Sequence, residues 1–328
     1  MSLHHALAIL LVAATSATTP KTDDNGLGRH PFLYCGEYEK DADQQTIHLV
    51  RGGRELWSYA IRFRVMRGGK EDIQELGDCT RLSNGNIIFT TRFGASEITP
   101  DKTIAWQYLA PDGTEIHSLQ PLGRDRVVLA QNGNPALALV IDKPSNTVIR
   151  RFEVPVARPD QVHGQLRRIR MTPAGTWLVA QMDMNKVIEY GADGTPVWSI
   201  DVPSPWSAVR LKTGNTLISS NKGFVREVDR TGATVWSYSR EDAAKAGIDL
   251  HNAQEVSRLA NGNTLISNWV AGAVPPEKWA GTIQVFEVTP DRRVVWKLAS
   301  WRRPRLGPAT SIQLLDEPGI PENGDLQR

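Results

Sequence analysis

A short pattern recurs along this chain and limits the folds it can adopt. Each copy has an apolar strand, a turn of Gly and Asn, a second strand, and a later strand that carries an aromatic residue. The pattern is clearest over residues 79–107, 206–238 and 253–268. Turns of this composition tolerate the positive φ angles of two-residue hairpins, and alternating β-branched residues flank them. Each copy is therefore predicted to begin with a β-hairpin.

The aromatic residue of the last strand recurs six times, with gaps of 49, 46, 46, 38 and 60 residues. Copies of about 40 to 50 residues with about four strands each match the blades of a β-propeller, in which radial stacking buries both faces of every sheet. The sequence thus predicts an all-β, six-bladed β-propeller of four-stranded antiparallel blades. A β-sandwich or barrel built from the same hairpins is the alternative. The six aromatic residues are Trp57, Trp106, Phe152, Trp198, Trp236 and Trp296.

The first copy lacks its first strand. Residues 31–61 supply its second, third and fourth strands, and residues 310–317 resemble the first strand of another copy at 207–211. A C-terminal strand is therefore expected to complete the N-terminal blade and close a propeller over residues 30–317. Residues 318–328 are then expected to be a loose tail.

The start of the chain predicts export. Residues 1–20 contain no Lys, Arg, Asp or Glu, and an apolar run at 6–14 is followed by small residues, so residues 1–19 are expected to be a signal peptide. That run is too short to span a bilayer, and no later stretch reaches about 18 apolar residues, so no transmembrane segment is expected. A secreted or periplasmic protein is predicted. In that oxidising environment Cys35 and Cys79 are expected to form a disulfide, with a reactive thiol as the alternative.

Composition excludes a disordered polyelectrolyte. The chain has 38 Lys and Arg residues against 36 Asp and Glu residues, a net charge of +2, and 40% of its residues are hydrophobic. These values are normal for a globular protein. We expect no nucleic-acid partner, and we expect the protein to be a monomer.

A candidate site is expected at one mouth of the central channel. In a propeller the loops that enter the innermost strands and the turns after the second strands lie on the same face. Polar residues in these positions would form a ring there; alternatively, their amides only satisfy backbone groups. The residues concerned are Gln131, Asn132, Gln181, Asn221, Lys222, Asn252, Asn268 and Trp269.

His163 and His251 occupy the same position in two repeats and are both expected to point toward the channel mouth. An imidazole can transfer protons, act as a nucleophile or bind a metal near neutral pH. The alternative is a structural role, in which each histidine bonds the backbone of a neighbouring blade. No HExxH or CxxC motif occurs, so no metal site is expected.

Arginines gather in the segments assigned to this mouth, among them Arg167, Arg168, Arg302 and Arg303. A basic mouth on a nearly neutral body would attract anions, and guanidinium groups suit carboxylate or sulfate. The favoured interpretation is an exported propeller that binds an anionic small molecule or glycan at the channel mouth. Solvated arginines without a ligand are the alternative.

Two motifs resemble known propeller families. The G-x-x-V-W-S segments Gly194–Ser199 and Gly232–Ser237, with the strand L-x-N-G-N-T-L-I-S, resemble PQQ-like (quinoprotein-type) repeats. Enzymes of that family that bind PQQ use eight blades and a docking series of tryptophans, which this sequence lacks, so no cofactor is expected. The hairpin after a His-bearing loop is also similar to arylsulfotransferase-type propellers. That resemblance implies catalytic roles for His251, His163 and Arg92.

Two other functions therefore stay open beside ligand binding. One is a histidine-dependent enzyme that transfers sulfuryl groups or cleaves an acidic glycan, with histidine as the base and arginine neutralising a carboxylate. The other is a protein-interaction scaffold in the cell envelope, which would bind a protein partner and no small ligand.

Overall fold

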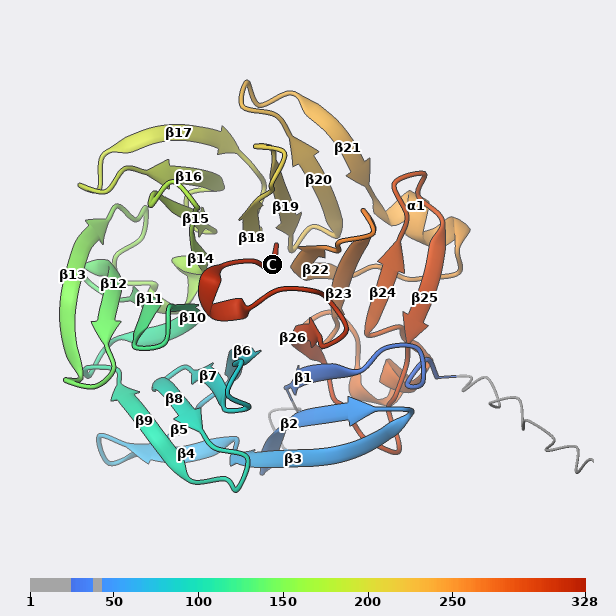
Figure 1. The fold of residues 1–328 in the computed structure, drawn as a ribbon, viewed down its shortest axis with the longest axis horizontal. Helices are drawn as coiled ribbons and strands as arrows, with labels where there is room; N and C mark the ends of the chain where they lie inside the picture. Colours follow the sequence, from blue (N-terminus) through green and yellow to red (C-terminus); the bar gives the residue numbers. More distant parts are fainter. Residues whose placement is uncertain (1–24, 38–42) are drawn as a thin grey trace, which may run out of the picture.

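The computed structural model describes residues 25–37 and 43–328, so the predicted signal peptide at 1–19 lies outside the described residues. The chain forms six four-stranded antiparallel sheets arranged around a central channel (Figure 1). The predicted six-bladed β-propeller is confirmed. No helix in the described part of the chain is long and apolar enough to cross a membrane.

Each blade runs from an innermost strand beside the channel to an outermost strand at the rim. From inside to outside, the strands are β26 (Ala309–Leu314), β1 (Phe32–Gly36), β2 (Gln44–Arg51) and β3 (Arg54–Arg62) in blade 1; β6 (Leu76–Arg81), β7 (Ile87–Thr91), β8 (Gly94–Ile98) and β9 (Ile104–Leu109) in blade 2; β10 (Glu115–Leu122), β11 (Arg126–Asn132), β12 (Ala136–Asp142) and β13 (Thr147–Val154) in blade 3. They are β14 (Leu166–Met171), β15 (Trp177–Gln181), β16 (Lys186–Tyr190) and β17 (Pro196–Asp201) in blade 4; β18 (Pro205–Arg210), β19 (Thr216–Ser220), β20 (Phe224–Val228) and β21 (Thr234–Tyr238) in blade 5; β22 (Asn252–Arg258), β23 (Thr264–Trp269), β24 (Val285–Val288) and β25 (Val294–Leu298) in blade 6.

Short elements are inserted between the blades. A hairpin of β4 (Arg64–Arg67) and β5 (Lys70–Ile73) precedes blade 2, and a 3-10 turn at Val162–Gly164 precedes blade 4. The helix α1 (Arg240–Lys245) begins with a capping box, in which Ser239 and Asp242 bond each other's backbone. A second 3-10 turn, Pro276–Gly281, lies within blade 6, and a third, Pro321–Asn323, lies in the C-terminal tail.

The hydrophobic core is divided into six clusters, each between two neighbouring blades. The predicted aromatic positions link the blades to one another. In five of them a tryptophan indole N–H donates to a turn of the next blade or to the segment before blade 1. Phe152 has no N–H and instead packs edge-on against Trp177 of the next blade, with ring centroids 5.3 Å apart. The indole bonds are Trp57 to Pro100 (2.8 Å), Trp106 to Asn146 (3.0 Å), Trp198 to Arg230 (3.0 Å), Trp236 to Pro290 (2.9 Å) and Trp296 to Gly26 (2.8 Å).

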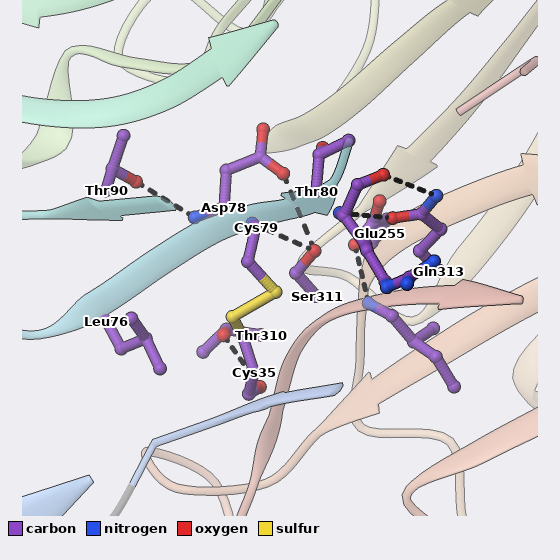
Figure 2. Close-up of a disulfide and its surroundings, with 12 residues drawn as sticks. Cys35, Leu76, Asp78, Cys79, Thr80, Thr90, Glu255, Thr310, Ser311 and Gln313 are labelled. Atoms are coloured by element: carbon purple, nitrogen blue, oxygen red, sulfur yellow. Dashed lines mark hydrogen bonds between the residues drawn. A yellow bond between two sulfur atoms is a disulfide. The ribbon is translucent and has the colours of Figure 1, made fainter. Parts of the chain in front are cut away.

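The ring closes as predicted, because β26 pairs antiparallel with β1 and supplies the missing first strand of blade 1. The predicted disulfide also forms. It joins Cys35 on β1 to Cys79 on β6, with 6.3 Å between their Cα atoms, and both residues are buried between blades 1 and 2 (Figure 2). The disulfide therefore fastens the shared blade to its neighbour.

Every innermost strand carries a β-bulge near its start, where it has one residue more than its partner strand. In blades 2, 4 and 6 two residues face one across the ladder, as at Arg167 and Arg168; in blades 1, 3 and 5 a single residue is left unpaired, as at His117. A bulge bends the strand and redirects its side chains. The unpaired residues are Gly77 and Asp78, His117, Arg167 and Arg168, Trp206, Gln254 and Glu255, and Thr310.

Three of these bulged residues meet in the channel as a buried ion network. Arg168 lies 2.6 Å from Asp78 and 3.8 Å from Glu255. Arg328, at the C-terminal end, lies 2.8 Å from Glu255, and Arg170 lies 3.1 Å from Asp78. All five side chains are at most 9% exposed. Oppositely charged groups thus fill the channel in place of an apolar core.

The expected loose tail is instead held against this network. Figure 1 places the C-terminal end at the centre of the ring. The tail bonds the turns between first and second strands: the Ser83 N–H donates to Glu322 (2.8 Å) and the Lys212 N–H donates to Gln327 (2.7 Å). Residues 318–328 therefore cover one end of the channel, because buried carboxylates attract Arg328 inward.

Removal of the disulfide should destabilise the propeller. The bond closes a segment of 44 residues, for which loop entropy predicts a loss of about 4 kcal/mol in the free energy of unfolding. Urea unfolding of a Cys35→Ala/Cys79→Ala variant would measure it. A reductant should lower the wild-type midpoint and leave that of the variant unchanged; equal midpoints with and without reductant in the wild type would contradict the prediction.

Acid should weaken the ion network. Burial alone would raise the pKa of Asp78, but the charges of Arg168, Arg170 and Arg328 lower it from 3.8 to about 2. A carboxyl group with a depressed pKa stabilises the fold at higher pH, and this contribution, about 2 kcal/mol, is lost as pH falls from about 4 to 2.

Arg328→Met tests the origin of this acid dependence by urea unfolding at several pH values. Removing one partner of a buried ion pair should cost about 3 kcal/mol at pH 6. The further loss between pH 4 and 2 should then be smaller than in the wild type, because Asp78 has lost one neighbouring charge. An equally steep loss in both proteins would assign the acid dependence to other carboxyl groups.

Candidate functional site

A cavity of about 160 Å³ opens at the channel mouth where the innermost strands begin, on the side of the ion network away from the tail. Loop and strand-end residues complete its wall, among them Glu37, Glu75, His163, Asn221 and Trp269. All six innermost strands contribute a bulged residue to its lining. These are Gly77, His117, Arg167, Trp206, Gln254 and Thr310.

Glu115, the first residue of β10, is the hub of the hydrogen bonds behind this wall. Its Oε2 atom lies 2.8 Å from Nε2 of His117 and 2.9 Å from Nδ1 of His163. Its Oε1 atom accepts a bond of 2.6 Å from Arg92. Burial alone would raise the pKa of Glu115, but the bonds from His117 and His163 lower it well below its ordinary range. Glu115 is therefore an ionised, acceptor-only group.

The partners of the two histidines determine which ring nitrogen carries the proton. Arg167 has only N–H donors, and its Nη1 lies 3.2 Å from Nδ1 of His117, so that nitrogen accepts. His117 must then carry its proton on Nε2 and donate it to Glu115. Burial lowers the pKa of His117 to about 3, which keeps the ring neutral at pH 7.

His163 has the opposite arrangement. Its Nδ1 faces the ionised Glu115 and must be the donor, which leaves a lone pair on Nε2 when the ring is neutral. Nε2 lies 3.8 Å from the Glu75 carboxylate, and the side chain is 49% exposed. His163 thus presents an oriented and accessible basic nitrogen at the mouth of the cavity.

Arg167 supplies a buried positive charge. The residue is 5% exposed, its guanidinium carbon lies 4.6 Å from the ring centroid of Trp206, and within the described part of the chain its Nε has no hydrogen-bond partner. Burial lowers the pKa of Arg167 to about 10, although Glu75, Glu115 and Glu37 oppose this effect. The group remains charged at neutral pH.

Among the residues that the structure describes, Glu115, His117 and His163 form a group that could hold a metal ion, because their ligand atoms lie within 4.8 Å of one another. Two histidines and one carboxylate suit several transition metals. A metal would need the lone pairs of His117 Nε2 and His163 Nδ1, and both nitrogens donate to Glu115 in the arrangement above. Arg167 would also have to leave His117, since a metal-bound ring carries its proton on Nδ1. The hydrogen bonds therefore favour a proton-carrying network over a metal centre.

Five residues predicted from the sequence to form the site line this cavity. Arg168 mainly pairs with Asp78, and the indole N–H of Trp269 donates to Glu37 (2.8 Å). Asn221 has an unpartnered, buried Oδ1 atom among the described residues. The five residues are His163, Arg167, Arg168, Asn221 and Trp269.

Most of the predicted amide ring holds other parts of the protein in place. Asn132 donates to the carbonyl of Val162 (3.0 Å) and so fixes the turn that carries His163. The alternative drawn from the sequence, that these amides satisfy backbone groups, describes Asn132, Gln181, Asn252 and Asn268. Further bonds of the set include Gln181 to Pro155 (2.6 Å), Asn268 to Asp249 (2.9 Å), Asn252 to Trp269 (3.3 Å), and the Tyr108 hydroxyl to Gln131 (2.9 Å).

The remaining predicted residues are not among those that line the cavity. His251 lies 3.1 Å from the exposed Asp249, and the imidazole beside His163 is that of His117 instead, with ring centroids 5.0 Å apart. Arg92 donates a hydrogen bond of 2.6 Å to Glu115. The side chains of Lys222, Arg302 and Arg303 are exposed to solvent.

Sequence reasoning missed Glu37, Glu75, Glu115, His117, Trp206, Gln254 and Thr310. Four of these residues, His117, Trp206, Gln254 and Thr310, are bulged residues of innermost strands. Because a bulge interrupts the alternation of a strand, periodicity gives no signal for it.

Comparison with known proteins shows the fold. No protein-family model matches the chain, and no curated protein sequence matches it. A solved protein of unknown function from Bacteroides caccae is 23% identical, with a TM-score of 0.70, covering 86% of this chain and 97% of that one. A catalytically inactive virginiamycin B lyase from Staphylococcus aureus with quinupristin is 12% identical, with a TM-score of 0.51, covering 84% of this chain and 87% of that one. A streptogramin B lyase is 13% identical, with a TM-score of 0.51 and 85% of each chain covered.

These similarities show that the chain shares its propeller fold with the solved proteins. They support the propeller part of the resemblance drawn from the sequence and do not favour PQQ-like repeats specifically. Function must be argued from the site, because one fold carries many activities.

The proton positions at the site can be measured. Nitrogen-15 NMR of labelled histidine should show His117 as the neutral Nε2–H tautomer from pH 7 to pH 5, because Arg167 occupies Nδ1 and burial disfavours the charged ring. Neutral His163 should be the Nδ1–H tautomer. In Arg167→Gln, His117 should no longer prefer the Nε2–H tautomer, since an amide can accept a hydrogen bond as well as donate one. A proton on Nδ1 of His117 in the wild type would contradict the network.

Proposed function

We propose that the channel mouth binds a small molecule that carries a carboxylate, and that an acidic sugar fits it best. The observation that carries this proposal is the buried Arg167. Its charged guanidinium lines the cavity and uses one N–H on His117, and its Nε has no hydrogen-bond partner among residues 25–37 and 43–328. A buried donor without a partner is costly, and a charged donor favours an anionic acceptor.

The other cavity residues support a sugar over a simple anion. Trp206 and Trp269 line the cavity, and indole rings provide flat apolar surfaces for the C–H face of a sugar ring. Gln254 and Asn221 also line it, and each has a side-chain oxygen that is buried and unpartnered among the described residues. Amide oxygens accept hydrogen bonds from hydroxyl groups. Carboxylate, hydroxyl groups and an apolar ring face occur together in a uronic acid.

Size and charge restrict the ligand further. A volume of about 160 Å³ is below the roughly 300–1,000 Å³ of pockets for drug-sized molecules, which suits one sugar unit. Longer chains would have to continue out of the open mouth. The cavity also contains Glu37 and Glu75 and lacks the exposed Arg302 and Arg303. This mixture of charges suits a single carboxylate held by Arg167 better than a densely charged polyanion.

A thermal-shift screen tests the proposal. A galacturonate trisaccharide at about 100 times its dissociation constant should stabilise the protein by about 2.7 kcal/mol, a rise of several degrees in Tm. The neutral galactose trisaccharide should give a much smaller rise. Arg167→Gln should weaken galacturonate binding about ten- to a hundredfold, because it removes a charged hydrogen bond.

Arg150→Gln is the matched control, because Arg150 also lies over a tryptophan, Trp177 at 4.9 Å, but is not among the residues that line the cavity. It should bind galacturonate like the wild type. Equal shifts with the acidic and the neutral sugar would exclude recognition of the carboxylate. No shift with any small molecule, together with a protein crosslinked from the cell envelope, would favour the scaffold.

A further inference from the structure

We propose that His163 is a catalytic base that removes the proton from the carbon next to the carboxylate of the bound ligand. The inference rests on the proposed function, because it requires that carboxylate to lie at Arg167. It adds chemistry to binding: the substrate class is a uronic acid linked to another sugar, and the reaction class is elimination.

His163 has the orientation that a base needs. The Nδ1–H of His163 donates to Glu115, with 2.9 Å between Nδ1 and Oε2. The lone pair of Nε2 is therefore directed away from Glu115. The 3-10 turn that carries His163 is held in turn by Asn132, which bonds the carbonyl of Val162. A carboxylate behind an imidazole selects its tautomer and stabilises the imidazolium that forms on proton transfer. Glu115 is thus a positioning residue for His163.

The two other histidines considered for the site, His117 and His251, do not fit this role. His117 is neutral and buried, and both of its ring nitrogens have partners, Arg167 and Glu115. His251 is not among the residues that line the cavity. His163 is half-exposed at the rim, so its Nε2 can reach a ligand and exchange protons with solvent.

Arg167 makes the proton removable. The hydrogen of a carbon next to a carboxylate is a weak acid, because its removal places further negative charge on the carboxylate oxygens. A guanidinium group on those oxygens stabilises the resulting enediolate, as preorganised donors do for developing oxyanions. Arg167 and His163 both contact His117, and all three residues line the same cavity. The carboxylate and the adjacent C–H group of one sugar unit would face these two residues.

The step balances without a co-reactant. Nε2 of His163 takes the proton from the carbon beside the carboxylate, and the electron pair of that C–H bond moves into the carboxylate to form the enediolate. The pair then forms a double bond to the next ring carbon, as the glycosidic oxygen there leaves with its bonding electrons. Water at the open mouth protonates that oxygen, and the half-exposed imidazolium of His163 releases its proton to solvent. The products are an unsaturated uronate and a shortened sugar with a free hydroxyl group.

The test follows the galacturonate trisaccharide in D2O with the whole protein. Proton NMR should show loss of the C–H signal beside the carboxylate, by exchange with deuterium or with formation of the double bond, which ultraviolet absorbance also detects. His163→Gln should bind the trisaccharide and slow this loss at least about 100-fold. The variant should fold, because the side chain is 49% exposed. Glu115→Gln should lower kcat more than it changes KM and should shift the nitrogen-15 signal of the His163 tautomer.

His30→Gln is the matched control, because His30 also bonds carboxylates, those of Glu287 and Asp316, but is not among the residues that line the cavity. It should exchange at the wild-type rate. One contrary result is that the wild type binds the trisaccharide without loss of the C–H signal beside the carboxylate, and another is that the signal is lost as fast with His163→Gln. Either result refutes the role of His163 as a base and leaves the binding proposal standing. If the wild type does not bind the trisaccharide, the acidic-sugar proposal fails first, and the inference fails with it.

Discussion

The bulge at the start of each innermost strand is the constraint on which both ends of the channel depend. A regular strand sends successive side chains to opposite faces, whereas a bulge bends the strand and redirects its residues. In blades 2, 4 and 6 the second bulged residues are Asp78, Arg168 and Glu255, which meet in the ion network. The first bulged residues of these blades line the cavity, as does the single one of each remaining blade. One irregularity, repeated six times, therefore builds the cavity and the charged layer beneath it.

That charged layer connects the cavity to the C-terminal tail. Arg168 lines the cavity, forms an ion pair with Asp78 and lies near Glu255, and Glu255 in turn pairs with Arg328. Isolated buried charges would be unstable, whereas charges that are paired and hydrogen-bonded to one another can be retained. The tail is thus part of the channel filling, and its position follows from the two carboxylates that the bulges direct inward. A loose tail would leave those carboxylates with one fewer compensating charge.

The sequence was sufficient for the fold because the fold depends on local, repeated signals. Turn residues, aromatic spacing and a missing first strand predicted six blades and the shared blade, and two cysteines in a chain expected to be exported predicted the Cys35–Cys79 disulfide. The site depends on registers that no local pattern encodes. His163 was placed at the mouth, but its neighbour is His117 of the adjacent blade and not His251, which lies two blades away in the ring. Equivalent repeat positions share a face without lying close together. The ring amides bond protein groups because buried loops must satisfy their carbonyl groups.

The hydrogen-bond chain through the site has a definite direction, which follows from the groups at its ends. Arg167 can only donate and the ionised Glu115 can only accept. His117 between them therefore accepts a hydrogen bond from Arg167 at Nδ1 and donates one to Glu115 from Nε2. His163 and Arg92 donate to Glu115 from its other sides. Of the five N–H bonds of a guanidinium group, Arg167 gives one to His117, and its Nε–H has no partner in the part of the chain that the structure describes. A carboxylate can therefore bind Arg167 without disturbing the bond that fixes the His117 proton, and the orientation of His163 is preserved while the cavity is filled.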